Sequence, residues 1–177
     1  MVNEQLDVEH LFTLDLQVAE GVKVLKDGPH GTRIIAEVEA GTFAGDRLNG
    51  VVVSPGGDWV TARADRSIQL DVRLTLITDD DAVILVQYKG IGDPSSGVAR
   101  SAPQFETGDE RYLWLNNVQG VGIGQLHPGG GVTYEVYALT QLPQRFWGET
   151  NQTLGALRKV LTSGAASASR LVILKSG

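Results

Sequence analysis

The chain has 177 residues, of which 42% are hydrophobic and 20% charged, a composition typical of one soluble globular domain. Its net charge of −6 disfavours nucleic acid and anionic membranes as partners, because both select basic surfaces. The lack of cysteine excludes disulfides, thiolate nucleophiles and cysteine-based metal sites, and His10, His30 and His127 are too scattered to suggest a metal centre. Because the sequence has no long apolar run and no signal-like N-terminus, we predict a cytoplasmic protein. Because it shows no metal-binding spacing and no cysteine, we predict that it needs no cofactor or metal.

Hydrophobic periodicity predicts an all-β protein. Apolar and polar residues alternate in about ten short runs, which is the pattern of half-buried strands. In chain order, the expected strands are 9–18, 22–25, 32–39, 46–53, 59–62, 67–78, 82–89, 112–115, 118–126 and 132–139. The TDDD and HPGGG segments between them are typical of antiparallel hairpins. Many short strands at even spacing favour a barrel or a sandwich.

Two segments depart from this pattern. Residues 90–111 show little periodicity, and a loop of this length in a compact domain is usually functional or disordered. Because Phe105, Tyr112 and Trp114 lie in or directly after it, we expect this segment to cap an opening of the barrel, with a disordered surface loop as the alternative. Residues 142–177 are predicted to form a C-terminal helix and tail appended to a barrel domain at 1–141.

Gly120, Gly122 and Gly124 could begin a dinucleotide-binding fingerprint, but they fall in an alternating run and no helix follows them, as that motif requires. In a strand, all three glycines share one face. A face without side chains leaves room either for close packing or for a ligand inside a barrel. Both interpretations remain open.

The segment SIQLDVRLTLI (67–77) poses the main question about function. Its leucine-rich face alternates with a polar face that carries Asp71 and Arg73, and the strand 32–39 has a similar mixed face that includes Glu37. On the outside of a barrel, the Asp71–Arg73 pair would be a solvated ion pair worth about 0.5 kcal/mol. In the lumen, it could orient a polar substrate or serve as acid and base. Periodicity alone does not choose between these two positions.

Several motifs resemble the bacterial and fungal family catalogued as domain of unknown function 3237. The resemblance is carried by VEHLFTLDLQV, GGDW, LDVRLTLITDDDAVILVQYKG, SAPQFETGDERYLWLNNVQGVGIGQ and GGGVTYEVYAL, in the order of the family, between about residues 7 and 139. Gln104 replaces an arginine common in the family, and Asp81 replaces a turn glycine. The resemblance implies an antiparallel, up-and-down, closed β-barrel of about eight to ten strands, expected as a homo-oligomer, with a small-molecule site in its mouth.

The resemblance also favours one shared pocket, because the D-x-R pair, the GGDW segment and the FETGD segment recur together in the family. It therefore favours the lumen for Asp71, as base or orienting carboxylate, and for Arg73, which would hold an anionic or carbonyl oxygen. The expected substrate-binding residues are Glu37, Asp58, Trp59, Glu106, Tyr112, Trp114 and Gly122.

These expectations support two main hypotheses about function. The first is a cofactor-independent enzyme of lyase, isomerase or cyclase type, acting on a small, partly apolar metabolite by general acid–base catalysis. The second is a lipocalin-like carrier or sensor that uses the same barrel without turnover. An enzyme needs a titrating group beside the ligand, whereas a carrier needs only an apolar lumen. A third hypothesis, an interaction scaffold that assembles through the tail, explains less of the chain.

Overall fold

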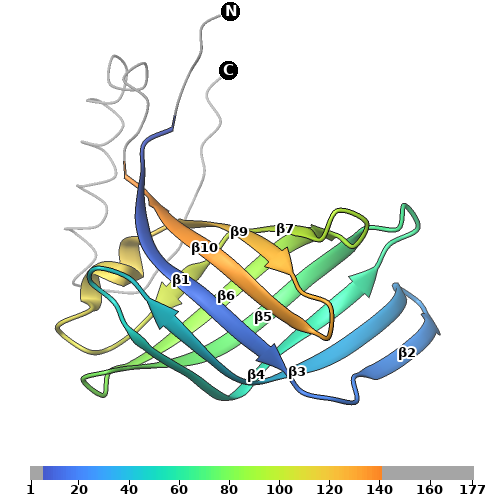
Figure 1. Cartoon of the computed structure of the whole chain (residues 1–177), viewed down its shortest axis with the longest axis horizontal. Coiled ribbons are helices and arrows are strands. Elements are labelled where there is room, and N and C mark those ends of the chain that lie inside the picture. Colours follow the sequence, from blue (N-terminus) through green and yellow to red (C-terminus); the bar gives the residue numbers. More distant parts are fainter. Residues whose placement is uncertain (1–5, 141–177) are drawn as a thin grey trace, which may run out of the picture. The chain divides into compact units, whose positions relative to one another are not determined.

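The computed structural model describes residues 6–140 (Figure 1). Along most of its strands, buried apolar side chains alternate with exposed side chains. This alternation lets one sheet curl so that its apolar face becomes the interior. The elements are β1 (Val8–Val18), β2 (Lys23–Gly28), β3 (Gly31–Ala44), β4 (Gly50–Ala62), β5 (Ile68–Thr78), β6 (Val83–Asp93), β7 (Val98–Ser101), β8 (Gln104–Glu106), the 3₁₀ helix η1 (Leu113–Asn117), β9 (Gly120–Leu126) and β10 (Gly131–Leu139).

Eight of these strands form a closed antiparallel barrel. The hydrogen-bonded order is β1-β10-β9-β7-β6-β5-β4-β3, and β3 pairs with β1 to close the ring. The other two strands are additions to this ring, since β2 pairs with β3 and β8 pairs with β6. Most neighbours in sequence are neighbours in the sheet, so the predicted up-and-down barrel is confirmed.

β3 is long enough to pair with two strands along the same edge. Its residues 38–44 pair with β1, and its residues 33–35 pair with β2. β1 and β2 therefore lie end to end along β3. Figure 1 shows the β2–β3 hairpin at one end of the barrel and η1 at the other.

Residues 54–58, which the prediction left as a connection between the strands 46–53 and 59–62, lie within one continuous strand. That strand is β4, and its register with β5 moves from Val53↔Thr75 to Gly57↔Arg73, which places two extra residues in β4. Such a bulge accommodates proline and glycine, since it interrupts the ladder locally. A Cβ atom on Gly57 would lie 2.9 Å from the Ala36 carbonyl oxygen, so the close approach of β3 requires glycine there.

The segment predicted as a long loop contributes two strands to the sheet. β7 pairs with both β6 and β9, which makes it part of the barrel wall, and β8 pairs with β6. Strands of three or four residues are too short to show clear alternation, which explains why the sequence pattern missed them. The predicted strand 112–115 is instead replaced by η1, because Tyr112, Leu115 and Val118 each donate a backbone hydrogen bond three residues back.

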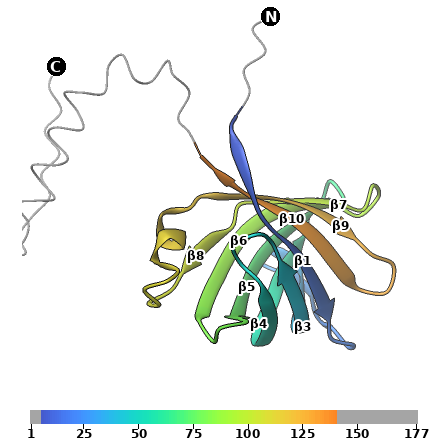
Figure 2. The ribbon, with the colours of Figure 1, turned by 60° about the vertical axis from the view of Figure 1, so that its left-hand side comes forward.

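Side chains fill the end of the barrel where η1 lies. The Phe12 ring contacts the rings of Phe43 and Phe105 edge to face, at centroid distances of 5.6 and 6.1 Å. Leu115 of η1 is fully buried in the same core. The segment from β8 to η1 therefore caps this end of the barrel, and Figure 2 shows β8 and η1 together there.

The predicted C-terminal helix and tail at 142–177 lie outside the described residues, so the boundary proposed at 141 remains a prediction. Within residues 6–140, the one helix, η1, has five residues and is too short to cross a membrane.

Candidate functional site

A cavity of about 290 Å³ occupies the barrel interior beyond the packed end. Leu16 and Val18, which follow Phe12 along β1, contribute to its wall. Most of the remaining lining is aliphatic and comes from the inward positions of β3, β4, β5 and β10. The polar exceptions among the described lining residues are Asp58, Tyr88, Tyr134 and His127.

Asp58 reaches the cavity from β4. It pairs across the strands with Val72, whose side chain is buried in the barrel, so both residues face inward. Its Oδ1 accepts a hydrogen bond of 2.9 Å from the backbone N–H of Asp71. Burial raises the pKa of Asp58 to about 6; the hydrogen bond from Asp71 lowers it in part, and the negative charge of Asp71 raises it. This carboxyl group therefore exchanges its proton close to neutral pH.

Tyr88 of β6 and Tyr134 of β10 form the second polar feature of the cavity. Both side chains are buried, and their rings meet edge to face with centroids 5.6 Å apart. Burial raises the pKa of Tyr88 well above its usual value and that of Tyr134 to about 12, and the charge of Asp58 adds to both shifts. Both phenols therefore remain protonated and able to donate hydrogen bonds at neutral pH.

The glycine face of β9 makes room for Tyr134. A Cβ atom on Gly124 would collide with the Tyr134 ring, and one on Gly122 would collide with Ser101 Oγ and lie 3.4 Å from Tyr134 Cδ1. Close packing is therefore the correct interpretation of these glycines. Gly122 was predicted to bind substrate, but it is covered by these side chains and is not among the cavity-lining residues.

Asp71 and Arg73 lie on the outer face of β5, which corrects the predicted position in the lumen. Their side chains are 32% and 51% exposed, and Asp71 Oδ1 lies 3.3 Å from Arg73 Nη1. The inward positions of β5 hold Leu70, Val72, Leu74 and Leu76, all buried. The physical reason is that an eight-stranded barrel has a narrow interior, and burying the leucine face releases more free energy than burying a charged face. The pair is therefore not placed in the lumen as predicted, and Asp71 contacts Asp58 through its backbone N–H.

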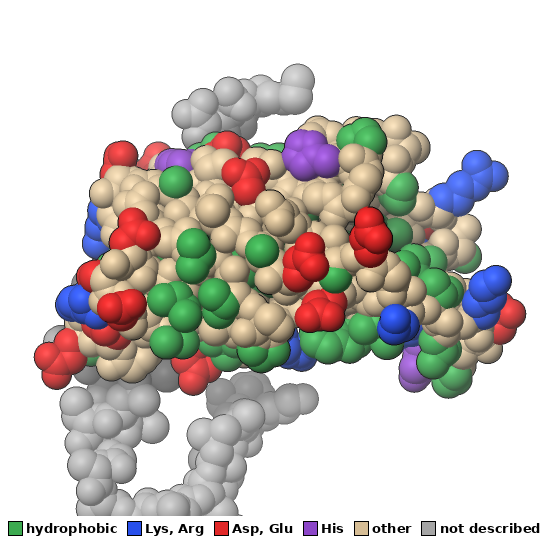
Figure 3. Space-filling model, turned by 60° about the horizontal axis from the view of Figure 1, so that its bottom comes forward, with side chains coloured by type: hydrophobic (Ala, Val, Ile, Leu, Met, Phe, Trp, Pro, Cys, Tyr) green, Lys and Arg blue, Asp and Glu red, His purple; other side chains and the backbone are tan. Residues whose placement is uncertain are grey.

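Glu37 and Trp59 also point away from the lumen. The residues beside Glu37 on β3, Ala36 and Val38, are the ones that line the cavity. The Trp59 ring is 39% exposed and lies 5.6 Å from the Arg73 guanidinium. Figure 3 shows one face of the exterior, where charged side chains are scattered among apolar ones. Neither residue is placed to contact a ligand in the cavity.

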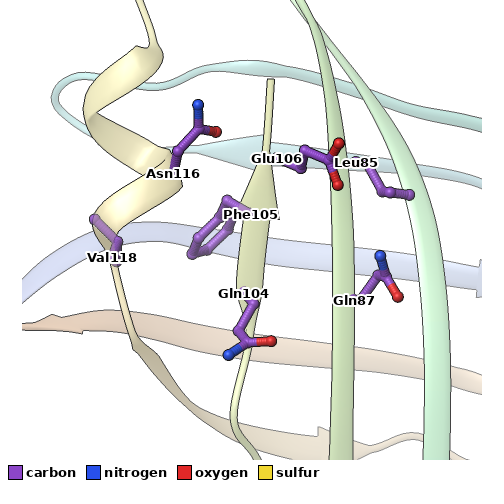
Figure 4. Close-up of a pocket in the computed structure, with 7 residues that line it drawn as sticks. All are labelled: Leu85, Gln87, Gln104, Phe105, Glu106, Asn116 and Val118. Atoms are coloured by element: carbon purple, nitrogen blue, oxygen red, sulfur yellow. The ribbon is translucent and has the colours of Figure 1, made fainter. Parts of the chain in front are cut away.

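Glu106 lies in a different hollow, outside the barrel. Its exposed side chain shares a groove of about 320 Å³ with residues of β6, β8 and the η1 region (Figure 4). The groove residues are Leu85, Gln87, Gln104, Phe105, Glu106, Asn116 and Val118. Phe105 also packs into the capped end, so this groove and the lumen lie on opposite sides of the same wall.

Tyr112 and Trp114 belong to the capped end rather than to the cavity. The Tyr112 hydroxyl donates a hydrogen bond of 2.9 Å to Asp80 Oδ1, and the Arg47 guanidinium lies 4.1 Å above the Trp114 ring. Both side chains are partly buried against the core. Neither residue is among those that line the cavity.

Of the predicted site residues, only Asp58 lies in the cavity, and sequence reasoning missed Tyr88, Tyr134 and His127. Each of these tyrosines lies two residues from a valine on the apolar face of its strand, so the sequence pattern resembled that of an ordinary core aromatic residue. His127 lies in the β9–β10 turn, where its Nε2 is 2.8 Å from Thr133 Oγ1. Within residues 6–140, no three His, Asp or Glu side chains lie close enough together to hold a metal ion.

Comparison with known proteins identifies relatives of the barrel. A UPF0311 protein of Rhodopseudomonas palustris is 28% identical over 138 residues, covering 69% of this chain and 90% of that protein. The hydroalkoxylation enzyme phnH of Penicillium herquei is 33% identical over 118 residues, covering 66% of this chain and 72% of that enzyme. A β-barrel-like protein of Acinetobacter baumannii has a crystal structure that superposes with a TM-score of 0.70 at 28% identity, covering 79% of this chain and all of that one. The family model described as protein of unknown function (DUF3237) matches residues 6–139, and the chain therefore belongs to this family.

Proposed function

We propose that this barrel is a cofactor-independent enzyme that binds a small, partly apolar molecule in its lumen and moves a proton through Asp58. The observation that carries the proposal is a carboxyl group with a pKa of about 6 in an aliphatic cavity, beside two protonated phenols. A group with a pKa near the working pH can both accept and return a proton, which is the requirement of general acid–base catalysis.

Each polar group has a distinct role in this proposal. Deprotonated Asp58 accepts a proton from a substrate hydroxyl, and protonated Asp58 later returns it. Tyr88 and Tyr134 donate hydrogen bonds to a substrate carbonyl or to the oxyanion that develops from it. The aliphatic wall excludes water and strengthens these interactions.

The relative phnH supports cyclase-type chemistry, because hydroalkoxylation adds an O–H group across a carbon–carbon double bond. For a hydroxylated enone, the bonds formed and broken and the proton transferred balance without a cofactor. Asp58 takes the hydroxyl proton, the oxygen forms a C–O bond at the β-carbon, and the electron pair of the double bond moves toward the carbonyl held by the tyrosines. Asp58 then returns the proton to the α-carbon.

A carrier or sensor of a small apolar ligand is the second candidate, because the cavity alone would serve it. The half-buried carboxyl group of Asp58 favours the enzyme. A carrier gains nothing from a group that titrates near pH 6, whereas an enzyme depends on one.

The test is turnover of a chalcone that has a phenol ortho to its carbonyl and cyclises to a flavanone with loss of enone absorbance. We expect catalysis by the wild type and a loss of about a hundredfold or more in Asp58→Asn, whose amide oxygen still accepts the Asp71 hydrogen bond. Glu39→Gln is the matched control, because it removes one negative charge from an exposed position on β3. Full activity of Asp58→Asn would overturn the proposed role of Asp58, and binding of the chalcone without turnover would favour the carrier.

A further inference from the structure

We infer that the lumen admits uncharged molecules and rejects organic anions of the same shape, so that the substrate is a neutral, hydroxylated and largely apolar compound. The inference rests on the proposed function, since it names the substrate class of the same site. It follows from the charges that line the cavity, the hydrogen-bonding groups available there, and the cavity volume.

The described residues that line the cavity offer an anion no permanently charged cation. Among the described residues that line it, there is no lysine or arginine. Asp58 supplies a negative charge when it is ionised, and Tyr88 and Tyr134 are neutral. His127, at the β9–β10 turn, already contacts Thr133 Oγ1, which in turn donates to Asp15 Oδ1.

An anion in this lumen would be disfavoured for two reasons. It would leave water for a mostly aliphatic wall without a compensating ion pair. It would also meet the like charge of Asp58 at close range. For two unit charges about 6 Å apart at an effective dielectric constant of about 20, this repulsion corresponds to about a hundredfold loss of affinity.

The same groups suit a neutral oxygen compound. The carboxylate of Asp58 accepts a hydrogen bond from a hydroxyl, and the phenols of Tyr88 and Tyr134 donate to a carbonyl. A volume of about 290 Å³ is at the lower limit of ordinary ligand pockets, which suits a molecule of about two fused or linked rings. Substrates that carry phosphate are therefore disfavoured by charge, and those that carry coenzyme A by charge and size together.

Unlike the cavity, the outer wall carries cationic side chains, and the test must take them into account. Arg33, Lys89 and His30 line a groove beside Trp59 on the exterior of the β3–β6 wall. An anion can find cations there without entering the lumen. Binding in the cavity must therefore be identified by competition between probes and not by binding alone.

The experiment compares a naphthalenesulfonamide with the naphthalenesulfonate of the same substitution, which have the same shape and differ in charge at every pH used. Calorimetry at pH 7.5 is expected to show binding of the sulfonamide and, in competition, displacement of the sulfonamide only at about a hundredfold higher concentration of the sulfonate. Asp58→Asn is expected to narrow the difference between the two affinities, because it removes the repulsion but not the cost of taking the sulfonate out of water, whereas Glu39→Gln should leave the difference unchanged.

A pH series on the wild type provides a second measurement that needs no variant. Sulfonate affinity is expected to rise as the pH falls through about 6, where Asp58 becomes protonated. The groups around Asp58 are Asp71 on β5, Tyr88 on β6, Tyr134 on β10 and His127 at the turn, and of these His127 can also gain positive charge. Asp58→Asn separates the contribution of Asp58 from that of His127, because any rise in sulfonate affinity that persists in this variant is due to His127.

The outcomes distinguish this inference from the proposed function. If the two probes bind the wild type equally and displace each other, charge selection is overturned while the lumen remains a binding site. If a sulfonate effect persists unchanged in Asp58→Asn, the role assigned to Asp58 in selection is overturned. If the sulfonamide does not bind at millimolar concentration, both the inference and the proposed lumen site are overturned.

Discussion

Replacement of Asp58 by asparagine is expected to stabilise the fold while removing activity. Burial raises the pKa of Asp58 from 3.8 to about 6, so the folded state holds the proton more tightly than the unfolded chain does. The contribution of Asp58 to the free energy of unfolding is fully present below about pH 3.8 and is lost as the pH rises to about 6. At about 1.36 kcal/mol per pKa unit, the wild type loses up to about 3 kcal/mol over this interval, and Asp58→Asn does not.

The assay is urea unfolding of both proteins between pH 4 and pH 8, followed by circular dichroism. We expect the stability difference, Asp58→Asn minus wild type, to grow from near zero at the acid end to about 3 kcal/mol above pH 6, and then to remain constant. Other titrating groups contribute equally to both proteins and cancel in the difference. A difference that does not change with pH, or a wild type that is the more stable protein at pH 8, would refute the argument that the partial burial of ionised Asp58 destabilises the fold.

Three further predictions concern packing and the outer face. Gly124→Ala is expected to cost about 1 to 3 kcal/mol in urea unfolding, because its Cβ atom would collide with the Tyr134 ring, and Tyr134→Leu in the same chain should recover part of the loss. Asp71→Asn and Arg73→Met are each expected to change the free energy of unfolding by less than about 1 kcal/mol, because the pair is solvated; a larger loss would show that the outer-face pair matters structurally. Phe105→Ala should lower stability by about 3 to 5 kcal/mol, measured by the same method, by opening a cavity at the capped end.

The strands of the barrel could be predicted because their information is local, whereas the choice of a closed barrel over a sandwich came from the family resemblance. Alternation along 67–78 and 132–139 requires half-buried strands, and the TDDD and HPGGG segments require reversals between antiparallel partners. These are properties of consecutive residues, so they need no knowledge of distant parts of the chain. Where the local signal was weak, as in the three residues of β8, or misleading, as in the proline and glycines of the β4 bulge, the prediction was wrong.

The candidate site was less predictable, because it depends on which face of each strand turns inward. Asp58 was identified, but its expected partners Asp71 and Arg73 lie on the other side of the wall. The glycines of β9 were recognised as unusual, yet their meaning depends on Tyr134, which reaches them from the neighbouring strand.

The sequence by itself determined that this chain forms an acidic, cysteine-free, all-β protein, because composition and period-two alternation are read directly from neighbouring residues, and the family resemblance implied the closed barrel. Only the tertiary structure decided where the cavity lies. Closing the ring commits one face of every strand to a narrow interior, where the aliphatic face gains most from burial, and it brings Asp58, Tyr88 and Tyr134 together from three separate strands. The unusual pKa of Asp58 is a consequence of that closure, since no single stretch of sequence contains the low-polarity surroundings that produce it.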